Sequence, residues 1–375
     1  MALPGGACDV AVVGAGIVGL ATAHELRERG VGVCLFESAR PGAGQSAGTT
    51  RIFRHSHRQP EVVGLAAESR GLWDAWEKRF ETSLLGDEGA LVTGPDVRAH
   101  EQRLSVAGVP CRMLTEEEQR EVHPALDPPG GAALLDELGG AIDVRAAVDA
   151  LSRSVSGSLV LGRVYRIDER GSGVFVDSSE GVWHAERVVV CAGAEVRELA
   201  PGLEFGGGCH VRATFAVRPH LRGRSLPCLQ EQSGEYGETV YGGPVPGEEN
   251  YVIGLSGPGN EIPAEPGQRV PGRNERVDEL AGRISRWVRR AMPGLDPEPV
   301  GLRLCITTVL PEGPDNFRIW REGAVTGLVG DNLFKFAPLL GRMLAGETGL
   351  RPASARTIPG HVVPSGSDSR ARTRP

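Results

Sequence analysis

The sequence predicts an α/β protein that combines a parallel sheet flanked by helices with a second, antiparallel sheet inserted into the same chain. Three observations predict this class. A strand, a glycine-rich turn, a helix and a second strand follow one another within the first 37 residues. A continuous apolar run at residues 187–194 is typical of a strand buried on both faces of a parallel sheet. Alternating segments between residues 210 and 255 are typical of antiparallel strands.

The glycine-rich turn has the composition of a dinucleotide-binding site. An apolar strand precedes Gly14, Gly16 and Gly19, which have the spacing G-x-G-x-x-G. Gly14 allows the tight turn, Gly16 lets a pyrophosphate approach the backbone, and Gly19 lets the helix pack close to the sheet. The N–H groups at the start of the helix, including those of Ile17 and Val18, offer donors to the phosphates.

The second strand ends in an acidic residue, Glu37, at the distance from the turn where a carboxylate accepts hydrogen bonds from both ribose hydroxyls. The negative charge would repel a 2′-phosphate, which argues against NADP. Together these features predict a Rossmann-type nucleotide-binding unit, and the alternative is a glycine-rich turn without a ligand. The turn by itself does not separate FAD from NAD.

Length, charge and cysteine usage narrow the class of protein. With 375 residues the chain is expected to form two domains. A net charge of −7 argues against a nucleic-acid partner, and no apolar run approaches the ~20 residues that span a membrane. Seven scattered cysteines without zinc-ligand spacing predict a reduced, cytoplasmic protein with no metal site. The N-terminus has no basic segment followed by an apolar core, so we expect no secretion signal.

The remaining elements are predicted in chain order from spacing and capping residues. Residues 61–80 have helical spacing, Thr115 and Glu118 form a capping box that starts a short helix, and residues 274–291 place apolar side chains on one helical face. Further strands are expected at residues 91–93, 132–135, 159–167, 173–176, 182–183, 210–218, 238–241 and 251–255, and further helices at 143–151 and 335–344.

These elements divide the chain into two discontinuous domains. The nucleotide-binding domain is expected at residues 1–60, 140–208 and 300–350, and the substrate domain at residues 61–139 and 209–299. Residues 351–375 are rich in Arg, Ser, Pro and Gly and are expected to form a disordered tail.

Four segments carry a family resemblance that covers nearly the whole chain to about Gly346. They are the glycine turn with its acidic residue, residues 50–55 (TRIFRH), residues 303–308 (RLCITT) with Pro311 and residues 315–317 (DNF), and residues 330–336 (GDNLFKF). On these segments the chain resembles the D-amino-acid oxidase (DAO) superfamily of FAD-dependent oxidoreductases, in the branch of monomeric sarcosine oxidase and N-methyltryptophan oxidase.

The resemblance implies a cofactor, a reaction and a substrate class. The cofactor is FAD, bound by a Rossmann-type domain with an inserted antiparallel-sheet substrate domain. The reaction is oxidation of the C–N bond of an amino acid or imino acid, with hydride transfer to flavin N5 and an imine product. The electrons then pass to O2, giving hydrogen peroxide, or to another acceptor. The substrate is a small amino-acid-like molecule with a carboxylate, and the protein is expected to be a monomer.

The resemblance also implies roles for individual residues. Cys305 falls on the cysteine that bonds through sulfur to the 8α position of the flavin, and the alternative is a buried strand cysteine beside noncovalent FAD. Arg51 falls on the arginine beside the flavin, and Arg54 on the arginine that binds the substrate carboxylate. Lys335 falls on the lysine that joins Arg54 there. Gly330 begins the last segment, which is expected to lie near the flavin.

The residue types at these positions agree with such roles. An arginine fork pairs bidentately with a carboxylate, and Arg51 and Arg54 face opposite sides if their segment is extended. A lysine between two phenylalanines needs an anion as partner. The bond at Cys305 needs a thiolate, so we expect a nearby cation, with Arg303 as the candidate, to lower the pKa of this cysteine. The alternatives are a solvated basic surface around the two arginines and a lysine that extends to water.

The chain departs from the family on the side of the substrate amine. Val252 stands at the position of a lysine that activates oxygen, and Ser256, Ala47 and Thr307 stand where the family has two histidines and a tyrosine. These departures argue against sarcosine and favour a bulkier amino acid, a cyclic imino acid or a specialised biosynthetic intermediate. Three alternatives stay open: a flavin dehydrogenase or tailoring enzyme that reacts poorly with O2, a non-catalytic flavin-binding subunit, and an NAD dehydrogenase.

Overall fold

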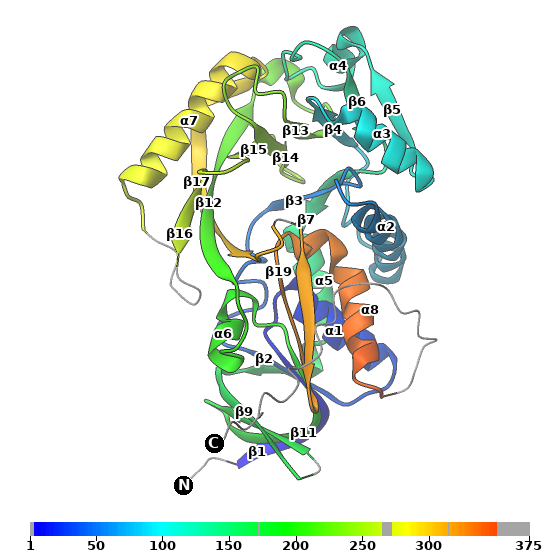
Figure 1. Ribbon diagram of the computed structural model, residues 1–375, viewed down its shortest axis with the longest axis vertical. Helices are drawn as coiled ribbons and strands as arrows, with labels where there is room; N and C mark the ends of the chain where they lie inside the picture. The colour runs from blue at the N-terminus through cyan, green and yellow to red at the C-terminus, as the bar shows by residue number, and fades with distance from the viewer. Residues whose placement is uncertain (1–3, 172, 265–271, 314, 351–375) are drawn as a thin grey trace, which may run out of the picture.

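The computed structural model describes residues 4–171, 173–264, 272–313 and 315–350. The tail expected at residues 351–375 lies outside the described residues. Figure 1 shows an elongated molecule with one large sheet in its lower half and another in its upper half. The lower sheet is rich in parallel pairs and the upper sheet is mainly antiparallel. The expected α/β class is therefore confirmed.

The lower sheet has eight strands, with β18-β19-β11-β1-β2-β8 as its central order. Its parallel strands are β1 (Pro4–Val13), β2 (Val33–Glu37), β8 (Leu159–Leu161), β11 (Gly181–Val190) and β19 (Val325–Gly330). The antiparallel strands are β9 (Val164–Arg170), β10 (Gly173–Ser178) and β18 (Phe317–Glu322). Val189 and Val190 are fully buried, as expected for the apolar run.

Three helices pack together against this sheet. They are α1 (Ile17–Glu28), α5 (Val144–Ser154) and α8 (Ala337–Glu347). Leu20, Ala21 and Leu340 are fully buried in the core that they share with the sheet. The helix that follows the glycine turn is therefore held rigidly, with its N-terminus at the carboxyl end of β1.

The upper sheet has nine strands, ordered β16-β12-β15-β14-β13-β4-β6-β5, with β17 paired to β12. The strands are β4 (Ala90–Thr93), β5 (Cys111–Leu114), β6 (Ala133–Asp136), β12 (Gly206–Val217), β13 (Cys228–Glu231), β14 (Val240–Pro244), β15 (Asn250–Leu255), β16 (Glu261–Ala264) and β17 (Leu295–Val309). The sheet is antiparallel except for β4 beside β13. These two strands come from separate insertions, so no hairpin sets their direction.

Helices cover the outer side of the upper sheet. In α7 (Glu275–Ala291), Leu280, Ile284 and Val288 are buried against the sheet, as their spacing predicts. The shorter α3 (Val97–Val106) and α4 (Glu116–Val122) lie at the other end, and α4 has the expected capping box between Thr115 and Glu118.

The remaining short helices are α6 (Val196–Leu199), η1 (Ser156–Ser158), η2 (Gly193–Glu195), η3 (Pro219–Leu221) and η4 (Leu333–Phe336).

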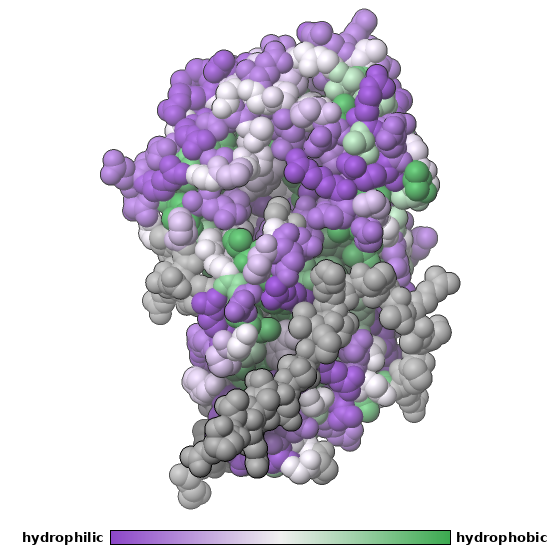
Figure 2. Space-filling view, viewed as in Figure 1, coloured by the Kyte–Doolittle hydropathy of each residue, from purple (hydrophilic) through white to green (hydrophobic). Residues whose placement is uncertain are grey.

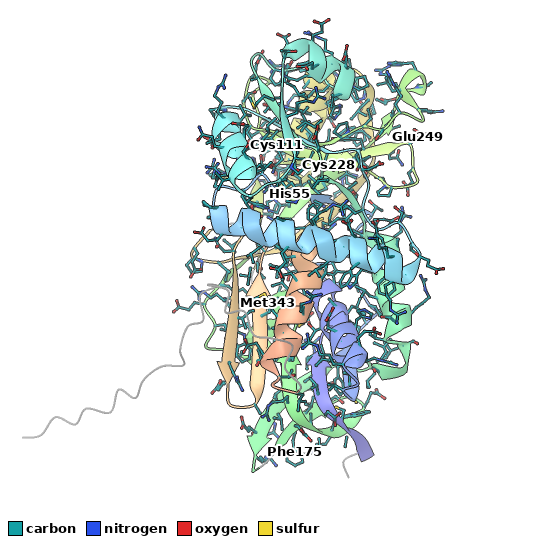
Figure 3. All side chains as sticks on the ribbon, turned by 90° about the vertical axis from the view of Figure 1, so that its right-hand side faces the viewer. His55, Cys111, Phe175, Cys228, Glu249 and Met343 are labelled. Carbon is teal, nitrogen blue, oxygen red and sulfur yellow. The ribbon has the colours of Figure 1, made fainter. Side chains whose placement is uncertain are left out.

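The long helix α2 (Pro60–Phe80) crosses the molecule between the two halves. Figure 3 shows it edge to edge across the view, with His55 on one side and Met343 on the other. Beside it, β3 (Thr50–Phe53) pairs with β7 (Gly140–Asp143). In the described residues, no helix has the length and apolar character needed to cross a membrane.

Several elements differ from expectation. Residues 159–167 are divided between β8 and β9, and residues 182–183 belong to β11 rather than to a separate strand. Lys335 lies in η4, and α8 begins only at Ala337. Pro338 has no N–H to donate to the carbonyl four residues earlier, so the helical ladder cannot run back through Lys335.

Candidate active site

A single cavity of about 1280 Å³ joins the two halves of the protein. Figure 2 shows apolar residues gathered at this junction on an otherwise mainly polar face. The expected site residues that line the cavity are Gly14, Gly16, Ile17, Val18, Glu37, Arg51, Arg54, Cys305, Gly330 and Lys335. The cavity therefore connects the glycine turn at one end with the two expected carboxylate-binding cations at the other.

The glycine turn has the geometry of a phosphate cradle. Gly14 has φ 99°, and a Cβ there would lie 2.5 Å from the carbonyl oxygen of Cys191. Gly19 lies behind the cavity wall, where a Cβ would lie 1.8 Å from the carbonyl oxygen of Gly14. A Cβ at Gly16 would approach only the Ser46 hydroxyl, at 3.2 Å. Side chains are thus excluded where the helix N-terminus opens into the cavity.

Two hydrogen bonds hold polar groups at this end of the cavity. The Ile17 N–H donates to Oγ of Ser46 at 2.9 Å. The Glu37 carboxylate accepts from the N–H of Ala15 and from the N–H of Ala39, both at 2.9 Å. Glu37 is therefore oriented by the turn itself, which suits a carboxylate that receives ribose hydroxyls.

Arg51 is fixed by backbone carbonyls rather than by an acid. Its guanidinium donates to the carbonyls of Thr50, Gln45 and Ala47 at 2.7–3.0 Å and lies 5.6 Å from the ring centre of Phe334. Burial, with help from a neighbouring arginine, lowers the pKa of Arg51 to about 10. The side chain therefore keeps its positive charge at neutral pH.

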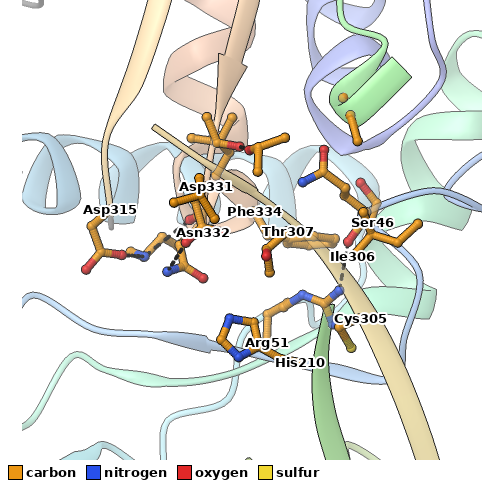
Figure 4. A pocket seen from close by; sticks show the side chains of 18 of the residues that line it. Ser46, Arg51, His210, Cys305, Ile306, Thr307, Asp315, Asp331, Asn332 and Phe334 are labelled. Carbon is orange, nitrogen blue, oxygen red and sulfur yellow. Dashed lines mark hydrogen bonds and ion pairs between the residues drawn. The ribbon is translucent and has the colours of Figure 1, made fainter. Parts of the chain in front are cut away.

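Cys305 faces a wall of cationic and polar side chains. In the register of β12 and β17, His210 is directly opposite Cys305, a position that places the Cβ atoms about 5 Å apart. The charges of Arg51 and Arg212 both interact with Cys305. Figure 4 shows Arg51, His210 and Cys305 close together in this part of the cavity. Arg303, the cation expected beside Cys305, is exposed on β17, whereas Arg51 and Arg212 are half-buried.

Arg212 is held in the upper sheet by an aromatic neighbour. Its guanidinium lies 5.2 Å from the ring centre of Tyr241, and its Nε donates to the Tyr241 hydroxyl at 3.3 Å. Gly254 lies between them in the sheet, and a Cβ there would be 2.6 Å from the Tyr241 hydroxyl. A glycine at this position is needed for the pair to form.

Arg54 and Lys335 come from distant parts of the chain and meet at one carboxylate, that of Asp315. Arg54 Nη2 lies 2.9 Å from Asp315 Oδ2, and Lys335 Nζ lies 3.4 Å from Asp315 Oδ1. Although burial acts to raise it, the two cations hold the pKa of Asp315 well below its usual range. Two converging cations that each engage one oxygen form a receptor for a carboxylate.

Buried contacts fix both cations. The Lys335 side chain is 5% exposed, so it does not extend to water. Its backbone carbonyl accepts hydrogen bonds from Ser69 Oγ at 2.7 Å and from Trp73 Nε1 at 2.8 Å, which tie it to α2. Around Arg54, His55 and His57 are buried, so this segment is not a solvated basic surface.

His57 completes the cluster as a neutral group. Burial and the charge of Arg54 lower the pKa of His57 to about 3. Its Nδ1 lies 3.3 Å from Arg54 Nη1 and 3.4 Å from Asp315 Oδ2, so it accepts from the first or donates to the second according to its tautomer. A neutral ring here leaves Arg54 and Lys335 as the cations of the receptor.

The four positions at which this chain was expected to depart from the family are not gathered at one place in the structure. Ser256 and Thr307 line the cavity, and Thr307 Oγ1 is buried without a hydrogen-bond partner among the described residues. Ala47 contributes the carbonyl that receives Arg51. Val252 is 8% exposed on β15 and stands opposite Thr214. None of these side chains carries a charge.

A second acid in the cavity, Asp331, predicts a pH dependence of stability. Burial and the charge of Asp315 raise the pKa of Asp331 to about 6, whereas an unfolded aspartate titrates near 3.9. Between these values the folded protein keeps a proton that the unfolded chain releases, so stability falls as pH rises. Asp331→Asn should therefore raise the melting temperature of the flavin-free protein at pH 7.5, by the equivalent of about 2–3 kcal/mol, and by much less at pH 4.

The matched control for this change is Asp96→Asn, which alters an exposed aspartate paired with Arg58. Its effect on melting temperature should be small at every pH. An equal stabilisation by Asp331→Asn at pH 4 and pH 7.5 would contradict the burial of a charged Asp331.

The sequence reasoning assigned no role to five residues of this site: Ser46, His57, His210, Arg212 and Asp315. The alternation of His210 and Arg212 in the expected strand at 210–218 places both on one face, which is a signal that the sequence contains. The contacts of Ser46 and Asp315 join distant segments, and no local sequence pattern predicts these contacts.

Comparison with known proteins agrees with this fold. N-methyl-L-tryptophan oxidase of Yersinia pestis (strain Pestoides F) is 30% identical over 207 residues, which cover 52% of this chain and 56% of that protein. The chain thus matches little more than half the length of this curated relative. The open form of NikD, an amino acid oxidase essential for nikkomycin biosynthesis, superposes with a TM-score of 0.81 at 23% identity and covers 94% of this chain and 96% of its own.

Further solved structures share the fold. L-proline dehydrogenase of P. horikoshii has a TM-score of 0.78 at 21% identity, covering 91% of this chain and 93% of its own. Glycine oxidase of Geobacillus kaustophilus has a TM-score of 0.77 at 20% identity, and the match covers 96% of this chain and 100% of its own. The sequence profile of the DAO family, described as FAD dependent oxidoreductase, matches residues 9–347. With its glycine turn, oriented acid and inserted sheet, the chain belongs to the DAO family of FAD-dependent oxidoreductases.

Proposed function

We propose that this protein oxidises the C–N bond of an amino acid or imino acid with FAD as its cofactor. The observation that carries the proposal is the meeting of Arg54 and Lys335 on one carboxylate, in the same cavity as the glycine turn. A substrate carboxylate bound there is oriented by two charges at fixed positions, and such orientation is a major part of catalysis.

The cavity residues fit FAD. The helix N-terminus at Gly14, Gly16, Ile17 and Val18 would receive the pyrophosphate, and Glu37 would receive the ribose. Arg51, Cys305, Gly330 and Lys335 would lie along the flavin ring, where the unpaired hydroxyl of Thr307 offers a further polar group. When bound, FAD accepts the hydride from the substrate and passes the electrons to O2 or another acceptor.

We also propose that the flavin is attached covalently through Cys305. Arg51 and Arg212 place positive charge near Cys305, and His210 stands opposite it in the strand register. Catalytic roles in this proposal belong to Arg51, Arg54 and Lys335, because these cations touch the cofactor or the substrate.

One observation favours a second candidate, a dehydrogenase or tailoring enzyme that reacts slowly with O2. Val252 provides no charge at the position of the oxygen-activating lysine, and its side chain is buried. The two candidates differ in a direct measurement: after anaerobic reduction, exposure to air restores the visible flavin band quickly in an oxidase and slowly in a dehydrogenase.

The test of the main proposal is an anaerobic titration of the yellow protein with a panel of amino and imino acids. We expect bleaching of the flavin band by a carboxylate-bearing amine, and no bleaching by the same amine without its carboxylate. A protein that no member bleaches would be a flavin-binding subunit without turnover.

The presence of two separate sheets supports a two-domain organisation of the chain. We propose that residues 1–60, 140–208 and 300–350 form the FAD-binding domain, which also supplies Arg54 and Lys335 to the carboxylate, and that residues 61–139 and 209–299 form the substrate domain. Strands β12 and β17 pass between the two parts. We propose further that the protein is a cytoplasmic monomer. All seven cysteines are unpaired, which suits a reducing compartment.

A further inference from the structure

The expected receptor for the substrate carboxylate already holds a carboxylate of the chain. Asp315 Oδ2 is paired with Arg54 and Asp315 Oδ1 with Lys335, so each oxygen serves one cation. A substrate carboxylate bound by the same two residues would need the same two positions. Figure 4 shows Asp315 at the edge of the cavity with its ion pair drawn.

The pairing is well shielded from water. The side chains of Arg54, Asp315 and Lys335 are 13%, 16% and 5% exposed. A second carboxylate at the same two positions would be repelled by the first, because water screens the two negative charges poorly there. Substrate binding is then an exchange of one carboxylate for another.

The backbone at Asp315 has a left-handed conformation and lies outside the strands. Asp315 has φ 59°, in the left-handed region that non-glycine residues seldom adopt. It lies in the connection between β17, which ends at Val309, and β18, which begins at Phe317. Rotation of the Asp315 side chain away from the cations breaks no strand pairing.

We propose that Asp315 is a specificity-determining residue that occupies the carboxylate receptor in the free enzyme and is displaced by the substrate. The inference rests on the proposed role of Arg54 and Lys335 as that receptor. Since every ligand carboxylate must replace the Asp315 pair, the loss of that pair offsets part of the carboxylate's binding free energy. The site therefore favours amino acids whose amine and side chain add further contacts, and it discriminates against ligands that offer a carboxylate alone.

The test compares Asp315→Asn with the wild type in the FAD-bound protein. The probe is phenylacetate, titrated against the visible flavin spectrum, with neutral phenylacetamide as its matched partner. We expect Asp315→Asn to bind phenylacetate about 10- to 100-fold more tightly, because the competing charged pair is gone, and to bind phenylacetamide as the wild type does.

A matched control uses the same connection between the strands. Glu312 carries a carboxylate there but pairs with Arg318, so Glu312→Gln should leave the affinity for phenylacetate unchanged. Asp315→Gly is the second variant, since glycine accepts φ 59° without strain and also removes the carboxylate. It should tighten phenylacetate binding as Asp315→Asn does, even if the asparagine variant folds poorly.

Two outcomes separate this inference from the proposed function. If both Asp315 variants bind phenylacetate as weakly as the wild type or more weakly, while Arg54→Met loses binding, the receptor stands and Asp315 only positions its cations. If Arg54→Met and Lys335→Met bind phenylacetate like the wild type, the carboxylate is bound elsewhere and the proposed receptor itself is wrong.

Discussion

Replacement of Lys335 by methionine should lower kcat/KM for the amino-acid substrate about 100- to 1000-fold. Truncating one partner of a buried, hydrogen-bonded charge pair costs about 3–4 kcal/mol, and each 1.4 kcal/mol is a factor of ten. Methionine keeps the length and apolar contacts of the side chain. Arg54→Met should have an effect of similar size, since Arg54 and Lys335 converge on the same carboxylate position.

The measurement is steady-state kinetics with the best substrate of the panel and with the corresponding amine that lacks the carboxylate. The expected loss appears mainly in KM, because the carboxylate is bound in both the ground state and the transition state. Lys78 is the only other lysine of the chain and is exposed on α2, so Lys78→Met is the control and should be silent. An equal loss for the amine without carboxylate would show that Lys335 serves another part of the reaction.

Replacement of Cys305 by serine should abolish acid-stable attachment of the flavin while FAD still binds. A serine hydroxyl does not ionise at neutral pH, so it cannot replace the thiolate in the bond to the 8α carbon. The glycine turn and Glu37 are untouched by this change. The measurement is acid precipitation: flavin stays in the wild-type pellet and moves to the supernatant in the variant.

Cys191 provides the matched control because it lines the same cavity, beside the glycine turn. Cys191→Ser should keep the flavin in the pellet. Flavin that remains in the pellet of Cys305→Ser would assign the bond to another residue. Flavin in the wild-type supernatant would favour the alternative of noncovalent FAD beside a strand cysteine.

Local patterns predicted the parts of the fold whose contacts are close in sequence. The capping box of Thr115 and Glu118, the buried face of α7 and the glycine turn each depend on residues within a few turns of one another. The same reasoning missed α3, whose short amphipathic stretch has a low apolar content. It also extended the last helix through Lys335, although Pro338 allows an α-helix only from Ala337 onward.

The residue types of the candidate site could be predicted from the sequence, but the side chains that interact with them were harder to predict. Arg51, Arg54, Cys305 and Lys335 were identified by type and by resemblance, and all four line the cavity. The cation expected beside Cys305 was Arg303, and the structure adds Arg51 and Arg212, two half-buried arginines whose charges act on Cys305. This partner choice depends on the register of β12 against β17, which pairs strands far apart in the chain.

By itself, the sequence determined the nucleotide-binding turn, the family and the residue types available for a carboxylate and a flavin, and the resemblance implied that Arg54 and Lys335 meet. Only the tertiary structure decided that His210 faces Cys305 and that Asp315 pairs with both Arg54 and Lys335. Those pairings arise where separate strands and α2 are packed together, and strand register and burial are properties of the assembled chain rather than of any segment.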